Sequence, residues 1–293
     1  MSLPDGAILI TGAAGFLGAS TARGLAAAGY EVIATDRDGV EGTLSLNVTD
    51  PEAVRKAIVR FRPAAVVHAA AVSGPMLMAE APREVWRINV DGTVNLLDAL
   101  RTTRMARVIL LSSTDVYGPV LGEVSEATAV APDTVYAASK VAAEAALAGY
   151  ARFYGLPGVA LRLSWVVGMG RRTPTALSGW VKDAVAGRTI ARPENPSGAA
   201  PYLHVDDAID AVVAALRVPA DTFRTYNTVP SRLKTRIAFA RDVADRFGVG
   251  LEDVPDIGDI CRSFYLRSEL ADQELSWQAR RDPLDAITVS PSH

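Results

Sequence analysis

Short apolar runs alternate with longer stretches of helical character along the first half of the chain. The apolar runs, which read as buried strands, end near Ile10, Thr35, Val67, Leu111 and Leu163. The stretches that read as helices include residues 51–61, 84–100 and 139–154. Strands that alternate with helices predict an α/β fold whose parallel sheet is covered on both faces. After Gly168 the pattern loosens, and segments rich in Pro, Gly and Arg appear, such as residues 192–198.

The composition limits the possible classes of protein. With 293 residues and 49% hydrophobic content, the chain can bury a large core, as one domain or one domain with a small appendage. The net charge of −3 gives no electrostatic reason to expect nucleic acid or an anionic membrane as a partner. Cys261 is the only cysteine, so an intrachain disulfide is impossible.

The chain also lacks the sequence signals of membrane insertion and export. No uninterrupted apolar run approaches the length of a membrane span, and residues 1–6 contain no basic segment that leads into an apolar stretch. We therefore expect a cytoplasmic enzyme without a signal peptide, and we expect no metal site.

A glycine-rich turn follows the first predicted strand. Residues 7–10 lead into Gly12, Gly15 and Gly18, with Phe16 and Leu17 inside the turn, and residues 19–28 then read as helix. The spacing is G-x-x-G-x-x-G, and it permits a tight turn, a close approach of backbone to a ligand and close packing of helix on strand. The helix N-terminus then offers free N–H groups to a pyrophosphate, which predicts a dinucleotide site.

The next strand, residues 31–35, ends at Asp36, eighteen residues after Gly18. A carboxylate at this place accepts hydrogen bonds from the adenosine ribose hydroxyls and repels a 2′-phosphate. Arg37 argues in the other direction, because an arginine beside the ribose can bind that phosphate. The glycine turn carries no Arg or Lys, so we predict NAD rather than NADP as the cofactor.

Tyr136 and Lys140 lie four residues apart in an alanine-rich stretch that reads as helix, so both side chains occupy one helix face. An ammonium beside a phenol favours the phenolate and lowers the tyrosine pKa from its usual value of about 10. The pair could then exchange protons near neutral pH. Taken alone, the same spacing also fits a surface pair without function.

Together these residues resemble the extended short-chain dehydrogenase/reductase family, in its sugar epimerase/dehydratase branch. The resemblance runs from about residue 8 to residue 227. Besides the glycine turn and the Tyr136/Lys140 pair, it rests on motifs at residues 68–71 (HAAA), 89–93 (NVDGT), 112–118 (SSTDVYG) and 204–208 (HVDDA).

The resemblance implies a Rossmann-like, doubly wound parallel sheet with a small C-terminal substrate lobe. Residues 1–167 would form mainly the NAD-binding domain. Residues 168–293 would form mainly the substrate lobe, with some segments returning to the core. A two-fold homodimer would form through helices 84–100 and 139–154, the second of which carries small residues at Ala142, Ala143, Ala145 and Ala146.

The resemblance also assigns the site residues. The catalytic set would be Ser113, Tyr136 and Lys140, with Thr114 as an alternative to Ser113. Hydride would pass between a carbinol carbon and the nicotinamide, while Tyr136 takes the hydroxyl proton, Lys140 holds the ribose hydroxyls and Ser113 orients the substrate oxygen. Cofactor contacts are expected from Gly12, Gly15, Phe16, Leu17, Gly18, Asp36, Arg37, Asn47, Val48, Ala69, Ala70, Ala71, Asn89, Tyr136 and Lys140.

Several of these positions carry a second interpretation. Asn89 could bind on the cofactor side or brace a loop, and Ala69, Ala70 and Ala71 could serve strand packing as well as the nucleotide. His68 is expected to be a structural histidine with satisfied hydrogen bonds. Asp206 and Asp207 are expected to be a helix N-cap pair.

Departures from the family pattern narrow the substrate. Family dehydratases carry Thr-Asp-Glu where this chain has Ser113-Thr114-Asp115, so dehydration is not expected. Nucleotide-sugar epimerases carry a diphosphate-binding Asn at the position of Trp165 and an Arg at that of Ala200. These losses favour a small sugar, sugar acid or polyol. Arg171 or Arg172 could anchor a carboxylate or phosphate, or both could be solvated loop residues.

Three functions remain open from sequence. The first is an NAD-dependent dehydrogenase of a small secondary alcohol. The second is an epimerase that keeps its NAD bound and returns the hydride to the other face. The third is a dinucleotide-binding regulator without turnover, which the presence of Ser113, Tyr136 and Lys140 disfavours.

Overall fold

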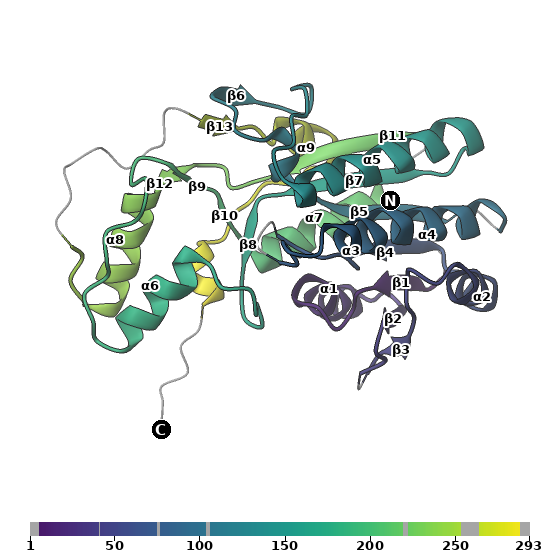
Figure 1. The fold of residues 1–293 in the computed structure, drawn as a ribbon, viewed down its shortest axis with the longest axis horizontal. Helices are drawn as coiled ribbons and strands as arrows, with labels where there is room; N and C mark the ends of the chain where they lie inside the picture. Colours follow the sequence, from purple (N-terminus) through teal and green to yellow (C-terminus); the bar gives the residue numbers. More distant parts are fainter. Residues whose placement is uncertain are drawn as a thin grey trace.

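The computed structural model describes residues 6–40, 42–74, 77–103, 106–218, 222–252 and 264–287. Its centre is a seven-stranded sheet in the order β11-β7-β5-β4-β1-β2-β3 (Figure 1), in which every neighbouring pair is parallel. The strands are β1 (Ile8–Thr11), β2 (Val32–Asp36), β3 (Leu44–Ser45), β4 (Ala65–His68), β5 (Arg107–Ser113), β7 (Gly158–Leu163) and β11 (Phe223–Thr228). The predicted Rossmann-like parallel sheet is therefore confirmed.

Helices cover both faces of this sheet. They are α1 (Phe16–Ala27), α2 (Pro51–Phe61), α3 (Pro82–Trp86), α4 (Gly92–Arg101), α5 (Val135–Tyr154), α7 (Val205–Arg217) and α9 (Glu269–Leu275). Ile8 and Ile10 of β1 pack in a core with residues of α1, α7 and α9, whereas Leu9 packs in a second core with residues of α2, α4 and α5. Because successive side chains point to opposite faces and both faces are buried, Ile8, Leu9 and Ile10 are all apolar.

A third core lies beside the sheet (Figure 1). It joins α6 (Ala176–Val185), α8 (Arg236–Phe247) and the 3-10 turn η3 (Pro283–Ala286) through residues such as Trp180, Phe239 and Leu284. Short strand pairs link this part to the sheet: β8 (Trp165–Val167) with β10 (Tyr202–His204), β9 (Ala199–Ala200) with β12 (Lys234–Thr235), and β6 (Gly122–Val124) with β13 (Phe264–Leu266). After residue 168 the chain returns to the sheet three times, with α7, β11 and α9.

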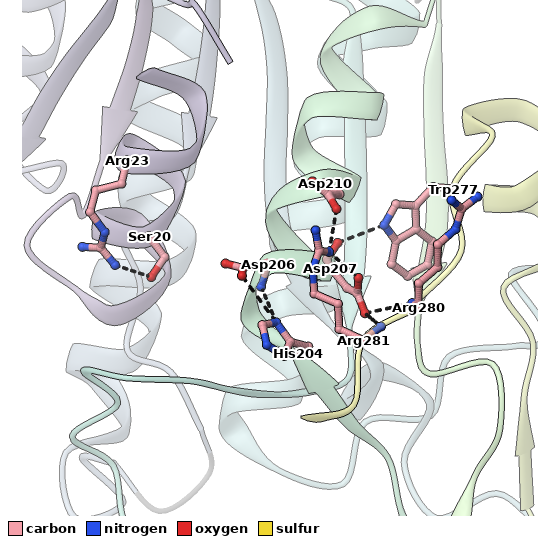
Figure 2. Close-up of polar contacts among 9 residues, drawn as sticks. All are labelled: Ser20, Arg23, His204, Asp206, Asp207, Asp210, Trp277, Arg280 and Arg281. Atoms are coloured by element: carbon pink, nitrogen blue, oxygen red, sulfur yellow. Dashed lines mark hydrogen bonds and ion pairs between the residues drawn. The ribbon is translucent and has the colours of Figure 1, made fainter. Parts of the chain in front are cut away.

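The segment between α9 and η3 is fixed to α7 by one buried carboxylate (Figure 2). Asp207, 1% exposed, accepts hydrogen bonds from the backbone nitrogens of Arg280 (3.0 Å) and Arg281 (2.9 Å) and from the Arg281 guanidinium (2.6 Å). The N-cap of α7 is His204, whose Nδ1 accepts from the Asp206 nitrogen at 3.0 Å. The prediction that Asp206 and Asp207 cap this helix is therefore wrong, since both lie in its first turn.

The described residues can also be examined for membrane spans and for metal sites. No helix among the described residues is long and apolar enough to cross a membrane, and the same residues contain no cluster of three potential metal ligands. Cys261 lies outside the described residues.

Candidate active site

The glycine turn follows β1 and passes directly over the end of β4. Gly12 has a φ of +71°, and a Cβ atom there would lie 2.6 Å from the Ala70 nitrogen. A Cβ on Gly18 would overlap the Gly12 carbonyl oxygen. Only glycine therefore allows these two loops to approach so closely, at the point where the strand order reverses between β1 and β4.

Helix α1 opens toward this crevice. It begins at Phe16 with Gly15 as N-cap, and no side chain caps its first turn. The first-turn N–H groups of a helix lack partners within the helix, so those of Phe16 and Leu17 can meet a ligand's anionic oxygens. Ala69 and Ala71, both half-buried, lie in the adjoining loop after β4. Small side chains there leave room for a nucleotide.

Asp36 ends β2 beside the glycine turn. Its Oδ2 accepts a hydrogen bond from the Ala14 nitrogen at 3.0 Å, so one carboxylate oxygen is fixed at the crevice. Arg37 turns away from this point and makes a two-pronged ion pair with Asp38, at 2.9 Å from Nε and 2.8 Å from Nη2. Both partners are exposed. Arg37 is therefore paired with Asp38, and the Asp36 carboxylate lies beside the glycine turn.

Asn47 and Val48 lie beyond β3. Asn47 Oδ1 accepts from the backbone nitrogen (3.1 Å) and the hydroxyl (2.9 Å) of Thr49, so its carbonyl closes a local turn. Val48 is buried and packs against Gly92, where a Cβ would lie 2.8 Å from a Val48 methyl group. The structure thus gives both residues a packing role at the edge of the crevice.

Asn89, 2% exposed, braces a loop, which is the second of its two expected roles. Its side chain accepts from the Val72 nitrogen (2.7 Å) and donates to the Val72 oxygen (3.1 Å) and to Ser139 Oγ (2.9 Å). These bonds tie the loop after β4 to helix α5. His68 is confirmed as a structural histidine, since its ring nitrogens contact Thr11 Oγ1 at 2.7 Å and Thr93 Oγ1 at 3.1 Å.

The predicted catalytic residues meet at the carboxyl end of the sheet. Ser113 ends β5, and Tyr136 and Lys140 lie in the first turns of α5, whose N-cap Thr134 accepts from the Ala137 nitrogen. The three residues are 8%, 8% and 6% exposed, in that order. Ser113 and Ser73 both lie close enough to the Tyr136 hydroxyl to lower its pKa, and Ser73 comes from the loop that Asn89 braces. Sequence reasoning missed Ser73, because no motif marks it.

The electrostatics of this group differ from expectation. Burial and, to a smaller extent, the nearby Asp115 raise the pKa of Tyr136 to about 12, against the lowering effect of Ser113, Ser73 and the charge of Arg171. Lys140 is not among the groups that shift this pKa. Its Nζ donates to the Leu111 carbonyl at 2.9 Å and lies 5.9 Å from the Tyr136 ring centroid. The expectation that Lys140 lowers the tyrosine pKa is therefore wrong, and burial lowers the pKa of Lys140 itself to about 8.

A buried ion pair between Glu144 and Arg162 lies next to Lys140 along the helix. Glu144 follows Lys140 by one helical turn, and its carboxylate accepts from Arg162 Nη2 at 2.7 Å and from Ser112 Oγ at 2.5 Å. Arg162 also donates to the Tyr117 hydroxyl at 2.8 Å, which donates to Asn227 at 2.7 Å. Sequence reasoning missed Glu144, although a charged residue on the apolar side of an alanine-rich helix was a signal.

The predicted substrate residues separate into two groups. Arg172 is exposed, whereas Arg171 is half-buried and its charge acts on Tyr202 and Tyr136. Thr114 is buried at the start of the 3-10 turn η2 (Thr114–Tyr117).

Trp165 begins β8 and packs against Tyr202, with 5.6 Å between ring centroids. Trp165 also lies near Asp115, a carboxyl group whose pKa is raised by burial and lowered by Ser113 and Trp165. The site therefore has an aromatic wall, and Asp115 and Tyr202 join it without having been predicted.

Comparisons with known proteins agree with this geometry. A sequence model described as the NAD dependent epimerase/dehydratase family matches residues 8–228. The chain is 32% identical over 300 residues to a UDP-glucose 4-epimerase of Mycolicibacterium smegmatis, with 92% of each chain covered. It is 31% identical over 226 residues to a 3-diazoavenalumate denitrifying reductase of a Streptomyces species, with 73% of each covered. The structure of a Thermus thermophilus UDP-glucose 4-epimerase in complex with NAD matches with a TM-score of 0.79 and 26% identity, over 93% of this chain and 94% of that one.

Proposed function

We propose that this chain, which belongs to the NAD dependent epimerase/dehydratase family, transfers hydride reversibly from a secondary alcohol of a small sugar, sugar acid or polyol. The family is NAD-dependent, and similar structures contain NAD. The observation that carries the proposal is the buried group formed by Ser113 at the end of β5 and Tyr136 in α5, with Lys140 one turn further along the helix. This group lies at the edge of the sheet where the glycine turn opens.

The residues of the crevice fit NAD. Gly12 and Gly18 let backbone approach a pyrophosphate, the first turn of α1 supplies N–H groups, and Asp36 offers a carboxylate to the ribose hydroxyls. Lys140 would hold the second ribose. Bound NAD supplies a hydride acceptor at its nicotinamide ring.

The protein's own residues would handle the proton. In the reducing direction, Tyr136 gives its hydroxyl proton to the substrate oxygen, and in the oxidising direction it takes that proton back. Ser113 orients the same oxygen by a hydrogen bond. Since burial raises the pKa of Tyr136 to about 12, the phenol is protonated at neutral pH and is prepared to act as an acid. Ser113, Ser73 and the charge of Arg171 lower the pKa of Tyr136, so they stabilise the phenolate that forms.

One position argues against dehydration, and two others support a small substrate over a nucleotide sugar. Thr114 cannot replace the acid that dehydratases carry there, which argues against elimination of water. Trp165 replaces an amide, and its indole is fixed against Tyr202 and Asp115, so it narrows the pocket. Ala200, 3% exposed, replaces a guanidinium. The relative described as a reductase is consistent with a net redox reaction.

A second candidate function is a nucleotide-sugar epimerase that retains its NAD. It is favoured by the UDP-glucose 4-epimerase of Mycolicibacterium smegmatis, which aligns over 92% of both chains. The two functions differ in the fate of the hydride, because an epimerase returns it to the substrate and a dehydrogenase releases NADH.

The test is a screen of sugars, sugar acids and polyols for NADH formation, with the Tyr136→Phe variant as the control for contaminating activity. Stoichiometric NADH from a small alcohol supports the first function. Interconversion of UDP-glucose and UDP-galactose without net NADH, with micromolar binding of UDP by calorimetry, would replace it by the second. NAD binding with neither activity would favour a regulator.

We also propose a two-fold homodimer built on α4 and α5. The outer side of α5 exposes Ala145, Gly149 and Phe153, the last of them 82% exposed. Ala143 belongs to the chain's own core, so the partner would meet Ala142 and Ala145 instead.

A further inference from the structure

Two arginines near Trp165 and Val166 of β8 each have a buried donor without a partner. Arg171 donates from Nη1 to the Val166 carbonyl oxygen at 2.5 Å, and Arg236 donates from Nη1 to the Glu194 carbonyl oxygen at 3.3 Å. The Nε atom of each is buried and makes no hydrogen bond. Among the described residues, no carboxylate is paired with either guanidinium. Buried donors are nearly always satisfied, so such a pair points to a ligand.

The two guanidinium groups converge on Tyr202. Strand β10 lays Tyr202 beside Trp165 of β8, and the Arg236 guanidinium lies 5.6 Å from the centroid of the Trp165 ring. The charges of both arginines act on the Tyr202 hydroxyl, and that of Arg171 also acts on Tyr136. Arg171, but not Arg236, therefore also acts on the hydroxyl that moves the proton.

The topology explains why Arg236 is found here. Strand β12 pairs antiparallel with β9, so that Thr235 lies beside Ala199 and Lys234 beside Ala200. Arg236 follows directly as the first residue of α8. A guanidinium from α8 thus reaches the neighbourhood of Ala200 and Trp165. Lys234 is not available for the same purpose, because it pairs with Asp242 at 2.5 Å.

We propose that Arg171 and Arg236 bind an oxyanion of the substrate, a carboxylate or a phosphate group, against Tyr202 and Trp165. The inference rests on the proposed function, because it specifies the substrate of that same site. Guanidinium groups bind both anions through paired N–H donors, and such charge-assisted bonds are strong. Because Arg171 acts on both tyrosines, the anion lies close to the reacting carbon, as in a short sugar acid.

The experiment is calorimetry on the NAD-loaded protein with three probes at millimolar concentration: D-glucuronate, D-glucose 6-phosphate and D-glucose. They share one ring and differ in the group at C6. At least one anionic probe is expected to bind tenfold or more tightly than glucose, and which one does so separates carboxylate from phosphate. Equal affinity for all three, or no binding of either anion, would overturn the inference.

Variants of Arg236, with a control at Arg172, test whether a guanidinium group binds the anion. Arg236→Gln should weaken binding of the preferred anion at least about tenfold and leave that of glucose unchanged, because only the anion meets the guanidinium. Arg236→Lys should retain part of the affinity, and Arg172→Gln, an exposed neighbour of the site, should retain all of it. A fully folded Arg236→Gln protein that binds the anion like wild type refutes the proposal. The readout is binding, so a failed search for turnover would count against the proposed function and not against this subsite.

Discussion

Replacement of Glu144 by Gln tests the ion pair behind the active site. Glu144 and Arg162 are 5% and 6% exposed, and the carboxylate accepts from Arg162 Nε (3.1 Å) and Nη2 (2.7 Å) and from Ser112 Oγ (2.5 Å). A glutamine keeps one acceptor and turns an N–H group toward these donors. Breaking a buried pair in this way leaves an uncompensated charge and costs roughly 3–5 kcal/mol.

The assay is urea unfolding followed by circular dichroism. The matched control is Glu123→Gln, since Glu123 also pairs with an arginine, Arg267, but both side chains are solvated and the urea midpoint should stay near that of wild type. A double variant, Glu144→Leu with Arg162→Met, should lose less stability than the two single variants together, because no charge remains buried. A loss below about 1 kcal/mol for Glu144→Gln, the range of exposed pairs, would refute the reasoning.

Glu144→Gln should also change NAD binding. Burial lowers the pKa of Lys140 to about 8, and the charge of Glu144 raises it, so removal of that charge lowers it further. If the ammonium holds the ribose, NAD affinity falls as pH rises through about 8 in wild type and at a lower pH in the variant. Calorimetric NAD titrations from pH 6 to pH 9 measure this, and superimposable profiles would remove Lys140 from the ribose contact.

Three further outcomes follow from the site and the surface. Tyr136→Phe should lower turnover at least about 10²-fold in the NADH assay while NAD binding is kept. Tyr154→Phe, on the same helix, should leave turnover unchanged. Equal turnover in both variants would exclude Tyr136 as the acid. NAD should bind more tightly than NADP. Asp36→Ala should reduce this difference in affinity, because the carboxylate no longer repels the 2′-phosphate. A wild-type preference for NADP in direct titration would contradict this. Sedimentation should show a dimer at micromolar concentration, and Ala145→Glu on the outer face of α5 should yield monomer; a wild-type monomer would refute the proposed interface.

The sequence alone determined the parallel sheet and the NAD crevice, because both depend on local patterns. A strand buried on both faces must be apolar at every position, as Ile8, Leu9 and Ile10 are. A turn that brings backbone to within contact of another loop must carry glycine, as at Gly12. The helical spacing of Tyr136 and Lys140 likewise placed both on one face of α5.

The depth of burial and the partners from distant segments were decided only by the tertiary structure. Spacing put Lys140 beside Tyr136, but burial and Asp115 set the tyrosine pKa in the opposite direction from the one expected. Ser73 and Arg236 reach the site from loops and elements that no motif marks, because a polar residue in sequence gives no sign of whether its partner is solvent or a side chain far along the chain. Pairing of β9 with β12 carries Arg236 to Trp165, and that contact exists only once both strands are in register.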